Sequence, residues 1–390
     1  MINILFKQLI AKTSYKLQHK ALLTALQLFN TKLSMDLSTN STAKRFCQEL
    51  DVKGNGIKIG THDGVFHCDE ILACFLLKQL PQYSTAQIIR TRDDKLLDEC
   101  DVVVDVGGVY DPNCHRYDHH QRDFTHTMSS ILQNKSFNIK LSSAGLVFTH
   151  FGHQIIARLL NWDKDDNKTD VIFDKVYENF IQEIDAIDNG VSICDGCQQN
   201  YRITTNLSSR VGNLIPSWNE TSDDDILYQR FLKGIELVGN EFKDKVDYYG
   251  SVWWPARQLI QQAIDSRMTV HPCGEIIELT QVFPWKEHLF LLESSNQIKP
   301  EVKFVIFQDT RGKWRVQAVP ISSHSFELRI PLLSDWRGLR DSELSKMAAI
   351  DGCVFVHSSG FIGGNDTREG AIQMAFKTLD NRRQSSAPNS

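Results

Sequence analysis

The pattern of apolar and polar residues predicts alternating strands and helices in the first half of the chain. The segment IKIGT (57–61) is expected to be a short strand, and EILACFLLKQL (70–80) has the apolar face of a helix. Two more strands are expected at 86–91 and 101–108, and the second is a nearly continuous valine run typical of a strand buried on both faces. This order of elements predicts the start of a doubly wound, mostly parallel α/β sheet.

The later pattern predicts a second, smaller α+β domain. Two apolar strands flank the turn TRG and are expected to pair as a hairpin, and GCVFVHSSGFIGGNDTREGAIQMAF (352–376) predicts a strand, a glycine loop and a helix. With the acidic run SDDD near the boundary, the first domain is expected over 56–215 and the second over 222–380. Further helices are expected at 143–160, 170–187, 224–248 and 253–267, and the hairpin strands at 302–309 and 313–320.

The two ends of the chain differ in composition from the rest. Residues 1–35 contain five lysines, no acidic residue and several hydroxyl side chains among apolar ones, which is typical of an organelle-targeting presequence. The alternative is a basic tail without a targeting role, and we expect import into mitochondria. Residues 36–55 are polar and predict a linker, whereas 381–390 are too polar to pack and predict a disordered tail.

Composition limits the classes of function. Of 390 residues, 41% are hydrophobic and 23% charged, as in a globular protein, and no apolar run is long enough to span a membrane. The net charge of −5 excludes a global basic field, so nucleic-acid binding would need a local basic groove or metal ions. Nine scattered cysteines fit a reducing compartment. The segment CDGC (194–197) is interpreted as unpaired thiols, in preference to half a zinc site or a redox pair.

Candidate metal ligands gather where the predicted strands end. The segment THDGVFHCDE directly follows the first strand and contains His62, His67 and Asp69. Ligands of an open α/β sheet bind at the carboxyl ends of its strands, so these side chains lie at the expected place. Asp105 ends the valine-rich strand, where burial of an unpaired carboxylate would be costly, and glycines follow it.

Two more segments add imidazole and carboxylate groups. YDHHQ contains Asp118, His119 and His120, and DAIDNG contains Asp185 and Asp188 at a predicted helix end. Each segment alone is explained by a hydrogen-bonded loop, a turn cap or the polar side of a helix. Together they supply enough ligands for two divalent cations, and a set without thiolate favours manganese or magnesium over structural zinc.

A pair of divalent cations would determine the class of reaction. Two metals about 3.5–4 Å apart clamp the oxygens of an in-line phosphoryl displacement. A bridging carboxylate is best placed on a rigid central strand, which is where Asp105 is expected. The residues therefore predict two-metal hydrolysis of a phosphoester.

Five segments in a fixed order carry a resemblance to a known family. THDGVFHCDE, VVDVGG, YDHHQ, DAIDNG and SGFIGGN are similar to the melanocyte proliferating gene exonuclease family, within the DHH phosphoesterase superfamily, over residues 56–380. The resemblance implies a DHH-type domain followed by a smaller α+β domain, with the active site in the cleft between them. It also implies a 3′–5′ exonuclease of single-stranded RNA that contributes to RNA processing in mitochondria, with a nuclear or nucleolar pool.

The resemblance also assigns roles to residues. His67 stands where the superfamily usually has the first aspartate of its first motif, and its spacing from His62 is one residue longer. Asp118 would orient a histidine, and His120 would face the scissile phosphate. The implied metal ligands are His62, His67, Asp69, Asp105, His119 and Asp188, with Asp185 as the runner-up for the last position.

The second domain offers a candidate substrate contact. Gly363 and Gly364 lie before a predicted helix N-terminus, where backbone N–H groups bind anions, and Arg368 could add charge. A plain tight turn is the alternative. The rival functions are hydrolysis of a small phosphoester or polyphosphate on the same fold, and a catalytically inert RNA-binding protein that keeps the fold. The sequence indicates neither the RNA target nor the oligomeric state.

Overall fold

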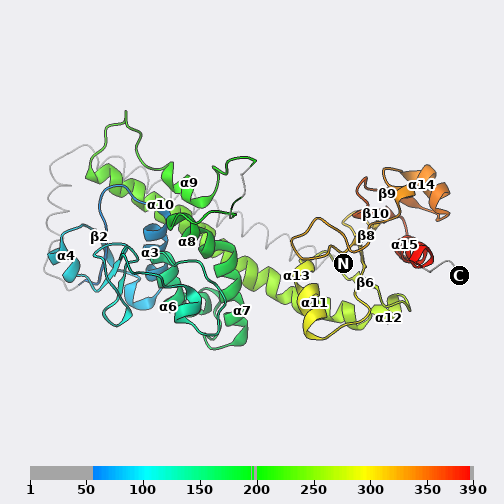
Figure 1. Ribbon diagram of the computed structural model, residues 1–390, viewed down its shortest axis with the longest axis horizontal. Coiled ribbons are helices and arrows are strands. Elements are labelled where there is room, and N and C mark those ends of the chain that lie inside the picture. Colours follow the sequence, from blue (N-terminus) through cyan, green and yellow to red (C-terminus); the bar gives the residue numbers. More distant parts are fainter. Residues whose placement is uncertain (1–55, 195, 197–199, 387–390) are drawn as a thin grey trace, which may run out of the picture. The chain divides into compact units, whose positions relative to one another are not determined.

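The computed structural model of the protein describes residues 56–194, 196 and 200–386 (Figure 1). The presequence expected at 1–35 and the linker expected at 36–55 lie outside the described residues. Among the helices of the described part, none combines the length and the apolar character that a membrane span requires. The described residues form a mixed α/β structure with two five-stranded sheets, each containing parallel strands.

The first sheet has the strand order β2-β1-β3-β5-β4, and only β4 runs antiparallel to its neighbour. The three longer strands confirm those expected from the sequence, whereas β4 and β5 have two residues each and were not predicted. The strands are β1 (Lys58–Thr61), β2 (Gln87–Arg90), β3 (Val102–Val104), β4 (Tyr110–Asp111) and β5 (Arg116–Tyr117).

The valine run of β3 is buried on both faces of this sheet, as predicted. Val102 and Val104 point into the large core, whereas Val103 packs with Leu97 and Cys100 on the opposite face. The large core is covered by helices, of which α3 is the most deeply buried. They are α3 (Cys68–Lys78), α5 (Met128–Ile131), α6 (Ser143–Leu160), α7 (Asn167–Val176), the π-helix η4 (Tyr177–Ile181), α8 (Gln182–Asp188) and α9 (Leu207–Gly212), with α4 (Asp94–Asp98) on the small core.

Helix α10 (Asp224–Asp247) packs its buried face against α3. Its apolar residues Phe231, Val238 and Phe242 belong to the same core as α3, although the domain boundary expected at 222 assigns this helix to the second domain. Two glycines of α10 allow the close approach: a Cβ on Gly239 would lie 2.3 Å from the Phe75 ring. The π-helix η5 (Tyr248–Trp253) and α11 (Trp254–Asp265) then follow without a break.

The second sheet has the order β6-β7-β8-β10-β9, with β6 and β7 parallel and the other neighbours antiparallel. The predicted hairpin is confirmed as β7 and β8. Two separate apolar clusters use opposite faces of the strands. The elements are β6 (Ile276–Leu279), β7 (Phe304–Gln308), β8 (Trp314–Ala318), β9 (Cys353–Val356), β10 (Ile362–Asn365), α12 (Arg267–Val270), α13 (Lys286–Ser295), α14 (Asp341–Ala348) and α15 (Arg368–Ser386).

The expectation of a glycine loop before the last helix is wrong, because Ile362–Asn365 form strand β10 in the interior of the second sheet. Gly363 and Gly364 pair with β8 on one side and with β9 on the other, so the ladder uses their backbone groups. A Cβ on Gly363 would lie 3.0 Å from the side chains of Leu332 and Met374. Close packing and strand pairing therefore explain the two glycines.

Two smaller expectations also need correction. The polar tail expected at 381–390 is wrong for 381–386, which continue helix α15, whereas 387–390 lie outside the described residues. Cys194 is disulfide-bonded, so the interpretation of CDGC as unpaired thiols is wrong for this residue. Free cysteines of the described part are Cys68, Cys74, Cys100, Cys114, Cys273 and Cys353.

The contact between α10 and α3 gives a stability prediction. Gly239→Ala should lower the free energy of unfolding by about 1–3 kcal/mol, because the added methyl overlaps the Phe75 ring. The control is Gly212→Ala in α9, where nothing lies within 4 Å of the added methyl and alanine favours the helix. Urea unfolding measures both variants, and a Gly239→Ala midpoint equal to that of the unmodified chain would contradict the close packing.

Candidate metal centre

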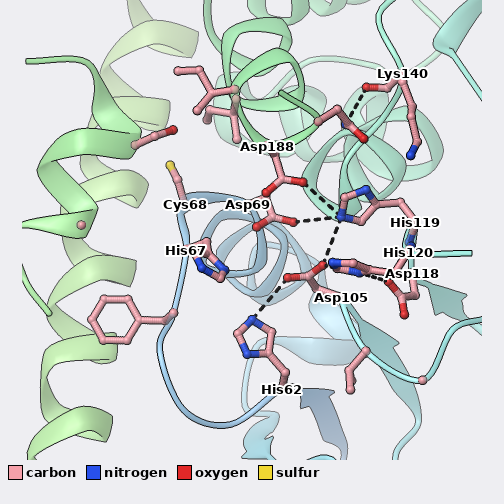
Figure 2. Close-up of a pocket in the computed structure, with 18 of the residues that line it drawn as sticks. His62, His67, Cys68, Asp69, Asp105, Asp118, His119, His120, Lys140 and Asp188 are labelled. Atoms are coloured by element: carbon pink, nitrogen blue, oxygen red, sulfur yellow. Dashed lines mark hydrogen bonds and ion pairs between the residues drawn. The ribbon is translucent and has the colours of Figure 1, made fainter. Parts of the chain in front are cut away.

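A pocket of about 910 Å³ opens at the carboxyl ends of three neighbouring strands (Figure 2). His62 follows β1, Asp105 follows β3, and the Asp118–His120 triplet follows β5. The remaining walls include the first residues of α3, the last residues of α8 and residues of α9. The structure therefore brings the four predicted segments together, because parallel strands end at one edge of the sheet.

Asp105 stands at the centre of this pocket. Its Oδ2 lies 3.4 Å from His62 Nε2, and its Oδ1 lies 3.3 Å from His119 Nε2, so one carboxylate faces two imidazoles. Its backbone has φ of 58°, a region that aspartate tolerates better than most residues, and Gly107 and Gly108 follow with positive φ. The turn after β3 thus aims the Asp105 carboxylate into the pocket.

The ligand atoms form overlapping groups that share Asp105 and His119. In each group these atoms lie within 4.8 Å of one another. One group includes Glu70, a residue that the sequence did not single out. The groups are His62, His67, Glu70 and Asp105; Asp69, His119 and Asp188; and Asp105, Asp118, His119 and His120.

Glu70 caps the start of helix α3 and also contacts the metal centre. Both of its oxygens accept from the His67 backbone N–H at 2.8 Å, as the third residue of a helix in a capping box does. Its Oε1 also lies 3.2 Å from His62 Nε2. The capping pattern was visible in the sequence as a glutamate near a helix start, but the contact with His62 depends on the fold.

Several buried polar atoms of the centre have no hydrogen-bond partner. These are both carboxylate oxygens of Asp69 and both ring nitrogens of His119, and the two side chains are almost fully buried. His119 Nε2 lies 3.1 Å from Asp188 Oδ2 and 3.9 Å from Asp69 Oδ2 (Figure 2). Unpartnered buried polar groups are costly, and a cation between the Asp69 carboxylate and His119 Nε2 would satisfy those atoms. The residues present therefore fit divalent metal ions.

The electrostatics of the centre agree with this fit. Burial raises the pKa of Asp69 well above its usual range, and the neighbouring carboxylates of Asp105 and Asp188 raise it further. Burial also raises the pKa of Asp188. Burial opposes ionisation of Asp105 too, but the close imidazoles of His119 and His62 outweigh burial and lower the pKa of Asp105. The negative charges of these carboxylates thus exceed the positive charge that the neighbouring imidazoles can supply.

Asp118 holds His120 in place. Its Oδ1 lies 2.7 Å from His120 Nδ1 and accepts from the His119 backbone N–H at 2.7 Å, while its Oδ2 accepts from Gly108 N–H at 2.6 Å. The hydrogen bond to Asp118 raises the pKa of His120. The His120 side chain is 62% exposed and lines the pocket.

The geometry favours Asp188 over Asp185 as the last ligand. Asp188 faces His119, whereas Asp185 accepts from the backbone N–H and hydroxyl of Ser142 and from the hydroxyl of Tyr177. Burial raises the pKa of Asp185 to about 7. Asp185 therefore anchors the start of α6 beneath the centre, away from the cluster of ligands.

The predicted substrate contacts of the second domain are not part of this pocket. All residues that line it fall between 62 and 215, and Gly363, Gly364 and Arg368 are not among them. Arg368 forms an ion pair with Glu278 at 2.6 Å. Their role in substrate binding, and the expected cleft between the two domains, stay predictions.

Fold and pocket together define a mixed α/β protein with a carboxylate and imidazole centre suited to divalent cations. A family model named MYG1_exonuc and described as "Uncharacterised protein family (UPF0160)" matches residues 58–379. The MYG1 exonuclease of Bos taurus is 49% identical over 93% of this chain and 94% of its own. That of Homo sapiens is 51% identical over 83% and 86%, and a MYG1 protein of Dictyostelium discoideum is 48% identical over 83% and 97%.

The chain therefore belongs to the MYG1 exonuclease family, which confirms the resemblance found in its sequence. A solved structure described as an exopolyphosphatase-related protein from Bacteroides fragilis aligns over 89% of this chain and 98% of that one, with a TM-score of 0.20 and 13% identity. At that TM-score the likeness does not establish a common fold.

The state of His62 predicts how metal binding depends on pH. Burial lowers the pKa of His62, but hydrogen bonds to Asp105 and Glu70 outweigh it and raise the pKa to about 10 in the metal-free protein. His62 is then protonated below that value, and a metal ligand must be neutral. Manganese binding should release at least about one proton, and its affinity should fall about tenfold for each pH unit between about pH 8 and about pH 6.

Titration calorimetry in two buffers of different ionisation enthalpy measures the protons released. The variant His62→Gln should bind manganese more weakly and release fewer protons. An affinity that is constant across this pH range would contradict the assignment of His62 as a ligand.

Proposed function

We propose that the protein is a divalent-metal-dependent exonuclease that hydrolyses single-stranded RNA from its 3′ end. The observation that carries the proposal is the cluster around Asp105, in which buried oxygens of Asp69 and nitrogens of His119 lack partners. The word exonuclease in the names of the bovine and human relatives supports nuclease activity. RNA as the substrate and the 3′–5′ direction rest on the family resemblance of the sequence motifs.

The residues divide naturally between two cations. His62, His67 and Glu70 would hold one, Asp69, His119 and Asp188 would hold the other, and Asp105 would serve both. Imidazole with carboxylate and no thiolate suits manganese or magnesium. Such ions supply charge stabilisation for phosphoryl displacement and make water a better nucleophile.

His120 is the residue best placed to act on the substrate directly. Its ring is held by Asp118 through Nδ1, and the residue lines the pocket. Because the bond to Asp118 raises the pKa of His120, the ring keeps a proton more readily at neutral pH. His120 would donate that proton to the oxygen that leaves, and Asp118 would stabilise the charged ring.

The proposed nuclease activity is tested by degradation of a 5′-labelled single-stranded RNA by the full-length protein. Reactions with manganese, with magnesium and with chelator are compared for the unmodified chain and for Asp105→Asn. Asparagine tolerates the positive φ of this position, so the variant should fold while losing the carboxylate that both cations share. We expect a metal-dependent ladder that shortens from the 3′ end and is absent in Asp105→Asn.

The matched control is Asp98→Asn, at an exposed position of α4 outside the pocket, which should keep full activity. Release of phosphate from polyphosphate without cleavage of RNA would replace the proposed substrate by a small phosphoester. Absence of both reactions, with RNA still bound, would favour the inert RNA-binding protein.

We further propose a mitochondrial location with a nuclear or nucleolar pool, supported by the acid-free, lysine-containing composition of residues 1–35. A fluorescent tag at the C-terminus of the full chain should then colocalise with a mitochondrial marker. The same tag on a chain that starts at Met35 should lose that location. Identical distributions of the two proteins would contradict a targeting role for these residues.

A further inference from the structure

Two basic side chains line the metal pocket, and the sequence motifs include neither of them. Within the described residues that line the pocket, Arg92 and Lys140 are the lysines and arginines. We propose that Lys140 and Arg92 bind successive phosphates of the substrate strand on opposite sides of the metal cluster. This inference rests on the proposed nuclease function and narrows the substrate to a chain with at least two phosphates.

Lys140 is fixed beside the histidines of the centre. Its backbone carbonyl accepts from the side chain of Asn189, the neighbour of Asp188, at 3.0 Å. Its Nζ lies 5.5 Å from the centre of the Phe124 ring, which in turn packs edge-on against His119 at 6.2 Å. Figure 2 shows the Lys140 amine on the side of the pocket where His119 and His120 lie.

The charge of Lys140 is not neutralised by a carboxylate. Within the described residues its ammonium group forms no ion pair, and the contact with Phe124 uses the face of an aromatic ring. A cation held at a pocket wall without a counter-ion is available to an anionic ligand. A phosphate that reaches His120 would therefore also meet Lys140.

Arg92 lies on the other side of the cluster. It follows β2, the edge strand beside β1, and its Nε lies 3.2 Å from Asp63, the residue next to His62. The two side chains are 64% and 56% exposed, so this ion pair contributes little and can open for a stronger anion. The remaining guanidinium nitrogens suit the oxygens of a phosphate.

Arg90, two residues before Arg92, has its guanidinium group engaged in contacts within the protein. Its guanidinium donates to the Gly64 carbonyl at 2.8 Å and lies 4.6 Å from the centre of the Phe231 ring and 5.8 Å from that of Phe66. Arg90 is thus committed to the loop that contains His62 and His67. It does not line the pocket, whereas Arg92 does.

The order of strands in the first sheet separates the two cations. Arg92 follows β2 at one edge, the ligands His62 and Asp105 follow β1 and β3, and the triplet beside Lys140 follows β5. The metal ligands therefore lie between the two basic side chains. A substrate strand that crosses the pocket from the β2 side to the β5 side can therefore contact both.

This arrangement also explains how a chain with a net charge of −5 can bind a polyanion. The carboxylates of the pocket face the cations that the metal ligands would hold, and the two basic groups add positive charge on either side. Binding then needs no extended basic surface, because the counter-charge is confined to the path of the substrate.

The test compares two substrates that differ in their number of phosphates. One is a short single-stranded RNA, and the other is a dinucleoside monophosphate with one phosphodiester. The full-length variants are Arg92→Met and Lys140→Met, with Lys164→Met as the control at an exposed position outside the pocket. With manganese, kcat/KM is measured for each substrate.

Arg92→Met should lower kcat/KM for the RNA about tenfold, and it should lower it clearly less for the dinucleoside monophosphate. Lys140→Met should lower both values, and Lys164→Met should change neither. Arg92→Lys and Lys140→Arg, which keep the charge, should restore much of the loss. Equal losses on the two substrates for Arg92→Met, or no loss for either methionine variant, would overturn the inference.

A binding measurement separates this inference from the proposed function. Fluorescence anisotropy of a labelled RNA is followed against salt concentration with calcium in place of manganese. Each methionine variant should reduce the slope of log affinity against log salt by about 0.7, the value for one single-strand phosphate contact. Slopes unchanged from the unmodified chain would overturn the inference. Reduced slopes in a protein that does not cleave RNA would support it while refuting nuclease activity.

Discussion

The crowding of carboxylates around one pocket is the constraint on which the rest of the structure depends. Asp69, Asp105 and Asp188 come from three different elements and meet at His119. Without cations, burial and mutual repulsion raise the pKa of Asp69 and Asp188. A fold that keeps these groups so close must be rigid, because every carboxylate would gain from moving toward water.

The rigidity has identifiable sources beneath the centre. Asp185 accepts three hydrogen bonds that join α8 to Ser142 and Tyr177, and Gly145 leaves no room for a side chain against it. Glu70 closes the start of α3 and touches His62 in the same position. Residues that stabilise helix ends thus also position the metal ligands. A substitution that removes a helix cap is therefore expected to shift the ligands as well.

Much of the first domain was predictable because its signals are local. The valine run of β3 and helix α6 match the sequence pattern, and the ligands fall at strand ends as parallel sheets require. The two-residue strands β4 and β5 were missed because they are too short for a period of two to show. Glu70, Arg92 and Lys140 were missed because only tertiary contacts bring them to the pocket.

The prediction of a glycine loop in the SGFIGGN segment failed for a different physical reason. Glycine pairs indicate turns when only local conformation matters. Here Gly363 pairs within a sheet, and Leu332 and Met374 leave little space for a Cβ on it. The choice between Asp185 and Asp188 was likewise beyond the sequence. Both lie on the short helix α8, three residues apart, and only the positions of Ser142 and His119 distinguish them.

The stacking of Arg90 on Phe231 changes how variation in helix α10 should be interpreted. Phe231 lies more than a hundred residues after the last histidine of the centre, in a helix whose buried residues look like ordinary core. Yet its ring supports the guanidinium that ties down the Gly64 carbonyl, in the loop of His62 and His67. A substitution at Phe231 would therefore loosen the loop of His62 and His67 in addition to its cost in core packing.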